Sequence, residues 1–284
     1  MAEGSILSLA GGIAIKHGNW LSKNLRNWLK GAADRAMKRL AALGRLITEP
    51  ARFCIRPLRR LWWRANTAAF RRCIERAGKN VAAQIFVKIG ANDGVTGDPC
   101  SDLLISGPSW HGLLIEPVPY CCDRLRQNFP DTSRFRVVEA AIDTRAGTRD
   151  LYFVRRDART SLPDLPIWYD QLGTFDRQHI EKHFGPRIIP FVERKPVAIR
   201  TYSDVMTDSV EGEYALLHVD TEGHDFEILK MALAYQRLPH IIFIEHAHLS
   251  RADRKLMIRA LKDHGYVVRN CGMDFFAFDR VQSA

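Results

Sequence analysis

The stretch "FVKIGANDGVTGDP", residues 86–99, decides the fold that we expect for this sequence. Its first half is apolar, as in a buried strand, and its second half is a loop with three glycines, which lets a backbone approach a ligand closely. Lys88 lies within the strand, two residues before Gly90. The stretch predicts a strand that leads into a ligand-binding loop, with a cation beside it.

From residue 81 onwards, short β-rich segments alternate with helical ones, which is typical of a parallel α/β sheet. The closing segments 265–270 and 274–280 predict two strands with an antiparallel reversal at Cys271–Gly272. Residues 155–195 form an irregular insertion rich in Pro, Arg and aromatic residues. The other expected elements are strands 84–90, 111–117, 134–143, 147–154 (an added hairpin-type strand), 214–220 and 240–246, and helices 120–129, 224–236 and 250–264.

Open α/β sheets bind ligands beyond the carboxyl ends of their strands. Each of the five predicted strand ends carries a carboxylate, and two of them also carry a histidine, which together indicate a cleft. These ends are Gly90–Gly94, Glu116, Ala141–Asp143, Asp220–His224 and Glu245–His248.

The glycine spacing distinguishes among ligands. Gly90, Gly94 and Gly97 read G-x-x-x-G-x-x-G, whereas dinucleotide-binding loops read G-x-G-x-x-G. Glu116, at the end of the second strand, is an acid that can accept both hydroxyls of a ribose. The pattern favours an adenosyl ligand that needs no pyrophosphate, a description that S-adenosylmethionine meets.

The segments "IGANDGVTGDP", "GLLIEPVPYCCDRLRQNFPD", "VVEAAIDTRAGTRDLYFV", "GTFDRQHIEKHF", "LLHVDTEGHDFEILKM" and "IIFIEHAHLS" resemble FkbM-type methyltransferases in order and character. The resemblance covers roughly residues 84–280 and leaves the N-terminus unmatched. It implies a class I Rossmann-like fold, S-adenosylmethionine as methyl donor, and a hydroxyl acceptor on a sugar, glycan or other small metabolite.

By position, the resemblance also implies roles for single residues. Gly90, Asn92 and Gly94 line the methionine end of the cofactor and Glu116 takes the ribose. Ala141 and Ile142 flank the adenine, Asp220 faces the reacting end, and Asp93 is counted with the cofactor-binding residues. Lys88 departs from the family pattern, which has Asp or a neutral amide at this position. An acid there would contact the α-ammonium group of the cofactor, whereas a lysine would repel it. We expect it to turn away or to pair with a carboxylate such as Asp93 or Asp220.

Methyl transfer from a sulfonium needs an aligned acceptor and a base, and histidine suits this role near neutral pH. We predict His246, next to Glu245, as the base and Asp220 as the orienting residue. His224 is the substitute if His246 points into the sheet. Polar caps or loop residues remain an equally good interpretation of these histidines.

His179 and His183 share a helix face, but no zinc-protease glutamate follows, so we expect no metal. A magnesium-assisted mechanism through Asp220 and Glu245 is less expected than a plain base. The aromatic residues of the insertion form either an acceptor wall or core: Trp168, Tyr169, Phe175 and Phe184.

The basicity of the chain lies in its N-terminal quarter. Residues 1–80 hold 17 Lys/Arg against 4 Asp/Glu, while the whole chain of 284 residues has a net charge of +10. We assign 1–80 to a basic helical extension and 81–284 to the methyltransferase domain, with 155–195 as a cover over the acceptor site. The pattern of residues 16–48 predicts a basic amphipathic helix. This helix contacts an anionic membrane surface or a partner helix, or it packs on the protein itself. A second helix is expected near residues 58–77.

The six cysteines show no CxxC pair, which favours a reducing cytosol. The apolar segment 5–15 is too short to span a bilayer. We expect a cytoplasmic protein with peripheral contact at a membrane. Two alternatives stay open: a catalytically inactive binding module, for which Lys88 is the evidence, and a nucleic-acid methyltransferase that uses the basic arm. Nucleic acid is the less expected partner, because the aromatic residues cluster with aliphatic ones and do not alternate with the cations.

Overall fold

A computed structural model describes residues 66–79, 83–207 and 211–279. They belong to one compact unit, Trp62–Ala284. The apolar segment 5–15 and the predicted amphipathic helix 16–48 lie outside the described residues.

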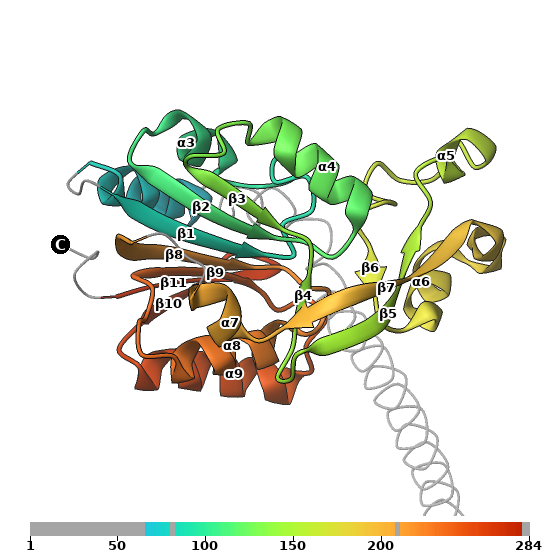
Figure 1. Cartoon of the computed structure of the whole chain (residues 1–284). Coiled ribbons are helices and arrows are strands. Elements are labelled where there is room, and N and C mark those ends of the chain that lie inside the picture. Colours follow the sequence, from blue (N-terminus) through green and yellow to red (C-terminus); the bar gives the residue numbers. More distant parts are fainter. Residues whose placement is uncertain (1–65, 80–82, 208–210, 280–284) are drawn as a thin grey trace, which may run out of the picture. The chain divides into compact units, whose positions relative to one another are not determined.

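A seven-stranded sheet forms the centre of this unit, in the order β10-β11-β9-β8-β1-β2-β3 (Figure 1). Only β11 runs antiparallel to its neighbours within this sheet. The strands are β1 (Gln84–Ile89), β2 (Trp110–Ile115), β3 (Phe135–Val138), β8 (Glu213–Val219), β9 (Ile241–Glu245), β10 (Val267–Asn270) and β11 (Asp274–Phe278). The expected α/β fold of class I methyltransferases, with its reversal at Cys271–Gly272, is confirmed.

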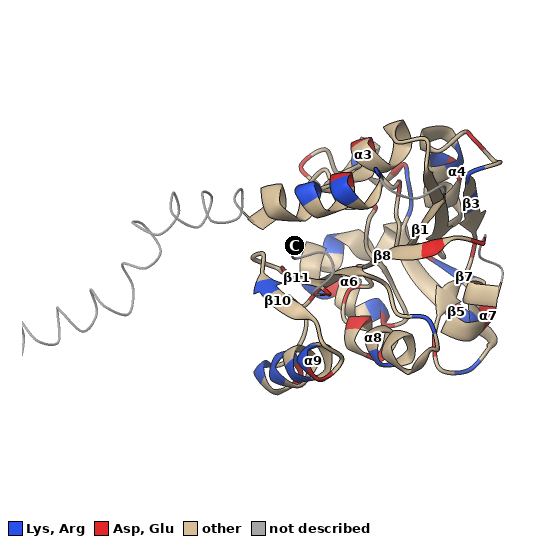
Figure 2. Ribbon diagram, turned by 90° about the vertical axis from the view of Figure 1, so that its left-hand side faces the viewer, with Lys and Arg blue, Asp and Glu red and all other residues tan. Residues whose placement is uncertain are grey.

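Helices cover both faces of this sheet (Figure 1). The α3 and α4 helices lie on one face, and α7, α8 and α9 on the other. Lys and Arg residues gather along α9 (Figure 2). The bounds are α3 (Ser101–Ser106), α4 (Pro119–Asn128), α7 (Tyr202–Thr207), α8 (Asp225–Ala234) and α9 (Arg251–Asp263).

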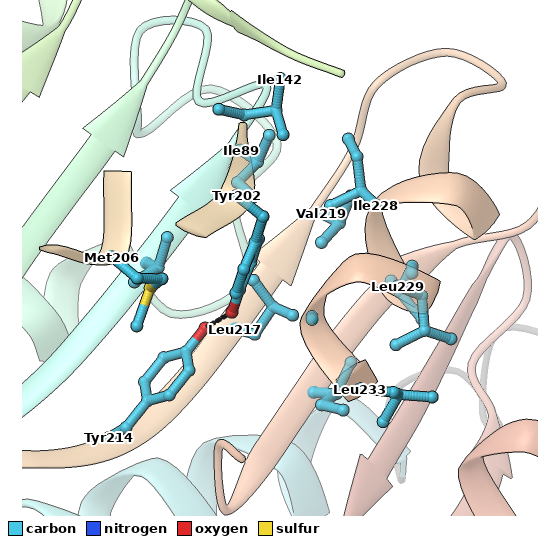
Figure 3. Close-up of a cluster of buried hydrophobic side chains, with 14 of the residues drawn as sticks. Ile89, Ile142, Tyr202, Met206, Tyr214, Leu217, Val219, Ile228, Leu229 and Leu233 are labelled. Atoms are coloured by element: carbon cyan, nitrogen blue, oxygen red, sulfur yellow. Dashed lines mark hydrogen bonds between the residues drawn. The ribbon is translucent and has the colours of Figure 1, made fainter. Parts of the chain in front are cut away.

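The core is divided by the sheet because successive strand residues point to opposite faces. In β1, Ile85, Val87 and Ile89 pack into the cluster beneath α7, α8 and α9. Phe86 packs into the cluster on the other face. Figure 3 shows the first cluster, in which the hydroxyls of Tyr202 and Tyr214 hydrogen-bond at 2.7 Å.

A helix over residues 66–77 packs on the second face. Its Phe70 is 0% exposed and stacks on Phe243 of β9 with ring centroids 4.6 Å apart. Ile74 is equally buried. The helix thus belongs to the core of the sheet, and its apolar face helps to cover the second face, although it lies within the residues 1–80 that we assign to the extension.

The third predicted strand, 134–143, is two strands in two sheets. Its first part is β3, in the central sheet. The chain then enters β4 (Ala141–Ile142), which pairs with β7 (Val192–Arg200) in a second sheet. That sheet has the order β4-β7-β5-β6, with β5 (Gly147–Val154) and β6 (Gly173–Thr174). The added strand 147–154 is thus confirmed, and its antiparallel partners are β7 and β6.

The insertion is more ordered than its composition suggests. It holds α5 (Ala158–Ser161), β6, α6 (Arg177–Phe184), the 3₁₀ helix η1 (Pro186–Phe191) and the start of β7. Tyr169, Ile180 and Phe184 form part of its own buried cluster. Two of the four aromatic residues weighed as an acceptor wall, Tyr169 and Phe184, are therefore core.

Across the described part of the chain, the helices are too short or too polar to cross a membrane.

Candidate active site

A cavity of about 560 Å³ lies at the carboxyl ends of β1, β2, β8 and β9 and extends to β4, β5 and β6 of the second sheet. The strand ends chosen from the sequence meet there, as parallel strands require. Most of the predicted site residues line this cavity: Gly90, Asn92, Gly94, Glu116, Ala141, Ile142, Asp220 and His224. Asp93 and His246 do not.

The loop after β1 passes very close to the end of β8. Gly90 has φ +74°, and a Cβ at this position would lie 1.7 Å from the carbonyl oxygen of Asp220. Only glycine therefore fits here. Asn92 also has a positive φ of 50°, and its Oδ1 is buried with no hydrogen-bond partner among the described residues. This oxygen lines the cavity as an acceptor that a bound ligand could satisfy.

Glu116 is held by the backbone on both sides of the cavity. Its Oε2 accepts a hydrogen bond from the Asn92 amide at 2.8 Å, and its Oε1 accepts one from the Val118 amide at 2.9 Å. Each carboxylate oxygen has a second lone pair, so both remain able to accept from a diol. Burial raises the pKa of Glu116 to about 7, despite these two bonds and with a smaller contribution from Asp220.

Asp93 shapes the loop and does not face the cavity. Its carboxylate accepts from the amides of Val95 at 3.0 Å and Thr96 at 2.7 Å. The prediction that Asp93 binds cofactor does not fit this position, because its oxygens are engaged in a local turn.

Lys88 is 2% exposed and forms an ion pair with Asp98. The expectation that it pairs with a carboxylate is confirmed, but the partner is neither Asp93 nor Asp220. Asp98 also accepts from the Cys100 amide at 2.8 Å and the Ser101 amide at 2.6 Å, and its Oδ2 lies 3.3 Å from Nδ1 of His218. Burial opposes the charge of Asp98, yet Lys88 and His218 outweigh it and hold the pKa of this carboxyl well below its usual value.

The opposite end of the cavity is strongly acidic. Burial raises the pKa of Asp220; His218 is the largest opposing influence, and the charges of Asp225, Glu222 and Asp274 each add a smaller increase. The side chain of Asp220 is exposed to the cavity and not to bulk solvent, and the surrounding protein atoms partly desolvate it. Buried Glu245 has a pKa far above its usual value, from burial first and then from Asp220 and other acids.

Two more carboxylates complete this end. Asp274 also lines the cavity, and burial raises its pKa to about 7. Asp225 instead holds the loop after β8, accepting from the amides of Thr221 at 2.8 Å and Gly223 at 3.0 Å. Carboxylates gathered in this number, with raised pKa values for Asp220, Glu245 and Asp274, favour a cationic ligand at this end.

The histidines separate clearly. His246 is 4% exposed and stacks on Phe275 with ring centroids 3.9 Å apart, and burial lowers its pKa. It is not at the cavity, so its choice as base does not fit the structure. His224 does line the cavity, and its Nε2 lies 3.3 Å from Oδ1 of Asp143.

Sequence reasoning missed Asp98 and Asp274. Nothing in the sequence marks Asp98 as the partner of Lys88, ten positions away across a loop. Asp274 follows the closing turn and reaches the site only because β11 lies beside β9. Of the insertion's aromatic residues, Phe175 lines the cavity, while Trp168 is 44% exposed and packs on Phe184.

The sheet order and a cavity with these groups at the strand ends define a class I methyltransferase. The methyltransferase FkbM domain model matches residues 88–268, more than half of the chain. The protein therefore belongs to the FkbM methyltransferase family, whose members use S-adenosylmethionine as methyl donor, as the resemblance implied.

Solved structures show a distant likeness. An FkbM methyltransferase from Methylobacillus flagellatus KT aligns with TM-score 0.41 and 14% identity, over 69% of this chain and 44% of that one. Precorrin-6y C5,15-methyltransferase from Geobacter metallireducens GS-15 gives 0.35 and 13%, over 73% and 85%. Fibrillarin from Aeropyrum pernix, solved with natively bound S-adenosyl-L-methionine, gives 0.33 and 14%, over 69% and 65%. No curated protein matches this chain.

Proposed function

We propose that this protein transfers a methyl group from S-adenosylmethionine to a hydroxyl group of a sugar, glycan or other small metabolite. The observation that carries the cofactor assignment is the pairing of two features in one cavity of about 560 Å³. Both carboxylate oxygens of Glu116 can accept a hydrogen bond from a diol, and the acidic end of the same cavity can hold a cation. S-adenosylmethionine has both a ribose diol and a sulfonium cation, and supplies an electrophilic methyl group when bound.

The hydroxyl acceptor is favoured by the pair of His224 and Asp143. The Asp143 carboxylate lies 3.3 Å from Nε2 of His224 without a hydrogen bond in this structure, and a small rotation of the ring would let Nε2 donate to it and leave Nδ1 to accept a proton from a hydroxyl. A hydroxyl needs such a base, because its own pKa is far above neutral. We therefore propose His224 as the base, oriented by Asp143, with Asp220 as an orienting residue at the reacting end.

The sugar-type acceptor is favoured by the wall that the insertion contributes. Phe175 lines the cavity and is stacked by the Arg149 guanidinium, 4.3 Å from the ring centroid. Gln171 and Thr174 line the same wall. An aromatic face beside amide and hydroxyl groups matches an acceptor that is apolar on one face and rich in hydroxyls at its edge.

The alternative of an inactive binding module depended on Lys88. Because Asp98 neutralises this lysine within the protein, its charge no longer counts against a cationic cofactor. No observation on the described residues favours the nucleic-acid alternative.

Cofactor binding is tested by calorimetry with S-adenosylmethionine and its demethylated product. Glu116→Ala should lower the affinity by about 1.5–3 kcal/mol, the contribution of hydrogen bonds to a charged group. Because the pKa of Glu116 is about 7, wild-type affinity should also rise from pH 6 to pH 8 as the carboxylate ionises.

Glu139→Ala is the matched control, since Glu139 is an exposed acid near the same strand edge, 42% exposed. Thermal melting of both variants reports whether Glu116→Ala still folds. A wild type that binds neither ligand, or a folded Glu116→Ala that binds as well as Glu139→Ala, would contradict the proposal.

A further inference from the structure

Three side chains from separate segments meet beside the acidic end of the cavity. His179 lies on α6, Glu222 on the loop between β8 and α8, and His248 follows β9. One ligand atom from each lies within 4.8 Å of the other two. Nε2 of His248 lies 2.9 Å from Oε2 of Glu222.

Ordinary hydrogen bonding does not account for this cluster. Nε2 of His179 is buried and has no partner among the described residues. The His183 ring lies 4.5 Å from that of His179 and 6.1 Å from that of His248, so three imidazoles crowd together.

A second observation comes from Glu245, at the end of β9. Its Oε1 lies 3.6 Å from Nε2 of His248, and its side chain is 9% exposed. Its Oε2 is buried without a hydrogen-bond partner among the described residues. A buried carboxylate oxygen without a partner beside this cluster is available as a ligand for a cation.

We propose that His179, Glu222 and His248 bind one divalent transition-metal ion of the zinc type, with Glu245 within reach as a fourth ligand. Two imidazole nitrogens and a carboxylate suit Zn²⁺, Fe²⁺, Co²⁺ or Ni²⁺ and not Mg²⁺ or Ca²⁺, which prefer oxygen ligands. Bonds of ~2.0–2.2 Å keep ligand atoms at most about 4 Å apart, so small side-chain rotations would close the site.

The ion would tie the insertion to the sheet. His179 belongs to the insertion, whereas Glu222 and His248 belong to loops at the carboxyl ends of β8 and β9. Glu222 and Glu245 line the cavity, so the site adjoins it. This site differs from the i, i+4 pair of His179 and His183 in the sequence, because His183 donates from Nδ1 to the carbonyl of His179 at 2.9 Å.

The test uses the full chain, freed of metal with a chelator and titrated with ZnCl₂ by calorimetry, and with CoCl₂ by visible absorption. We expect one ion per chain and the d–d bands of Co²⁺ bound by nitrogen and oxygen. His179→Ala and His248→Ala should each weaken binding by at least about 10–100-fold, the loss known even for residues that only support metal ligands. His264→Ala, an exposed histidine at the end of α9, should bind as wild type.

Near-ultraviolet circular dichroism confirms that the variants are folded. Equal affinity in wild type and a folded His179→Ala, or MgCl₂ binding as tightly as ZnCl₂, would overturn the proposal. S-adenosylmethionine is titrated into the metal-free protein in parallel. Binding of S-adenosylmethionine without any zinc binding overturns the metal site alone and leaves the proposed methyl transfer intact.

Discussion

Lys88 lies buried in the sheet because it forms an ion pair with Asp98. Asp98 also accepts hydrogen bonds from two backbone amides. Asn at position 98 keeps an acceptor for those amides but loses the charge. Removing one partner of a buried pair costs about 3–5 kcal/mol, because the other charge is left alone. Asp98→Asn should therefore lower the free energy of unfolding by about this amount at pH 7, as measured by urea denaturation.

The same pair predicts a pH dependence. The folded pKa of Asp98 lies below its usual value of 3.8, so its stabilisation is present above pH ~4 and lost as pH falls towards the folded pKa. The gap between wild type and Asp98→Asn should shrink below pH ~4. Lys88→Met combined with Asp98→Asn should be more stable than Asp98→Asn alone, and a double variant as unstable as the sum of both singles would refute the pairing.

The base is the second residue-scale prediction. His224→Ala should lower the rate of methyl transfer by about 10²–10⁴ while cofactor affinity stays nearly unchanged. The assay follows labelled methyl groups from S-adenosylmethionine into a small-metabolite extract.

His246→Ala is the paired variant. Because His246 is buried against Phe275, we expect this change to lower thermal stability and to leave the rate of methyl transfer by the folded protein nearly unchanged. A folded His246→Ala protein that loses methyl transfer, beside an unaffected His224→Ala, would restore the first assignment.

At the scale of elements, the helix over 66–77 is a component of the core. Phe70 contacts the rings of both Phe243 and Phe276, with centroids 4.6 Å and 5.3 Å away. Phe70→Ala should lower the free energy of unfolding by about 3–5 kcal/mol through the cavity it leaves. Arg72→Ala, exposed on the same helix, should change it by no more than about 0.5 kcal/mol. Equal melting temperatures for the two variants would return this helix to the N-terminal extension.

The strands were predictable because each has a local apolar pattern, and β1, β8 and β9 lie within a residue of their expected bounds. The break between β3 and β4 was not predictable. Ala141 and Ile142 are as apolar as a continuing strand would be, and they change sheets only because β7 pairs with them. Order within the insertion was missed for a related reason, since its short elements are stabilised by their own buried cluster and not by strong local propensity.

At the scale of the molecule, the sequence has an excess of positive charge in residues 1–80. Because of this charge, we propose that residues 16–48 contact anionic lipid. Each Lys or Arg near such a surface contributes about 1 kcal/mol. Changing five of them to Gln in the full chain should abolish co-sedimentation with phosphatidylserine vesicles. The five are Lys23, Arg26, Lys30, Lys38 and Arg45.

The control changes four exposed cations of α9 to Gln: Arg251, Lys255, Arg259 and Lys262. This variant should sediment with vesicles as the wild type does. Loss of sedimentation in both variants would mean that binding follows net charge and not the predicted helix. Sedimentation retained in the first variant would refute the lipid contact.

The sequence by itself determined the sheet, its glycine loop and the positions of Gly90, Glu116 and Asp220. Strand ends follow from local periodicity, and strands in one parallel sheet must bring those ends together. Only the tertiary structure decided that Lys88 pairs with Asp98, that His224 and not His246 faces the cavity, and that His179 meets His248. These choices depend on which side chains of distant segments point at one another, and that direction is set by packing around each residue, which no local pattern encodes.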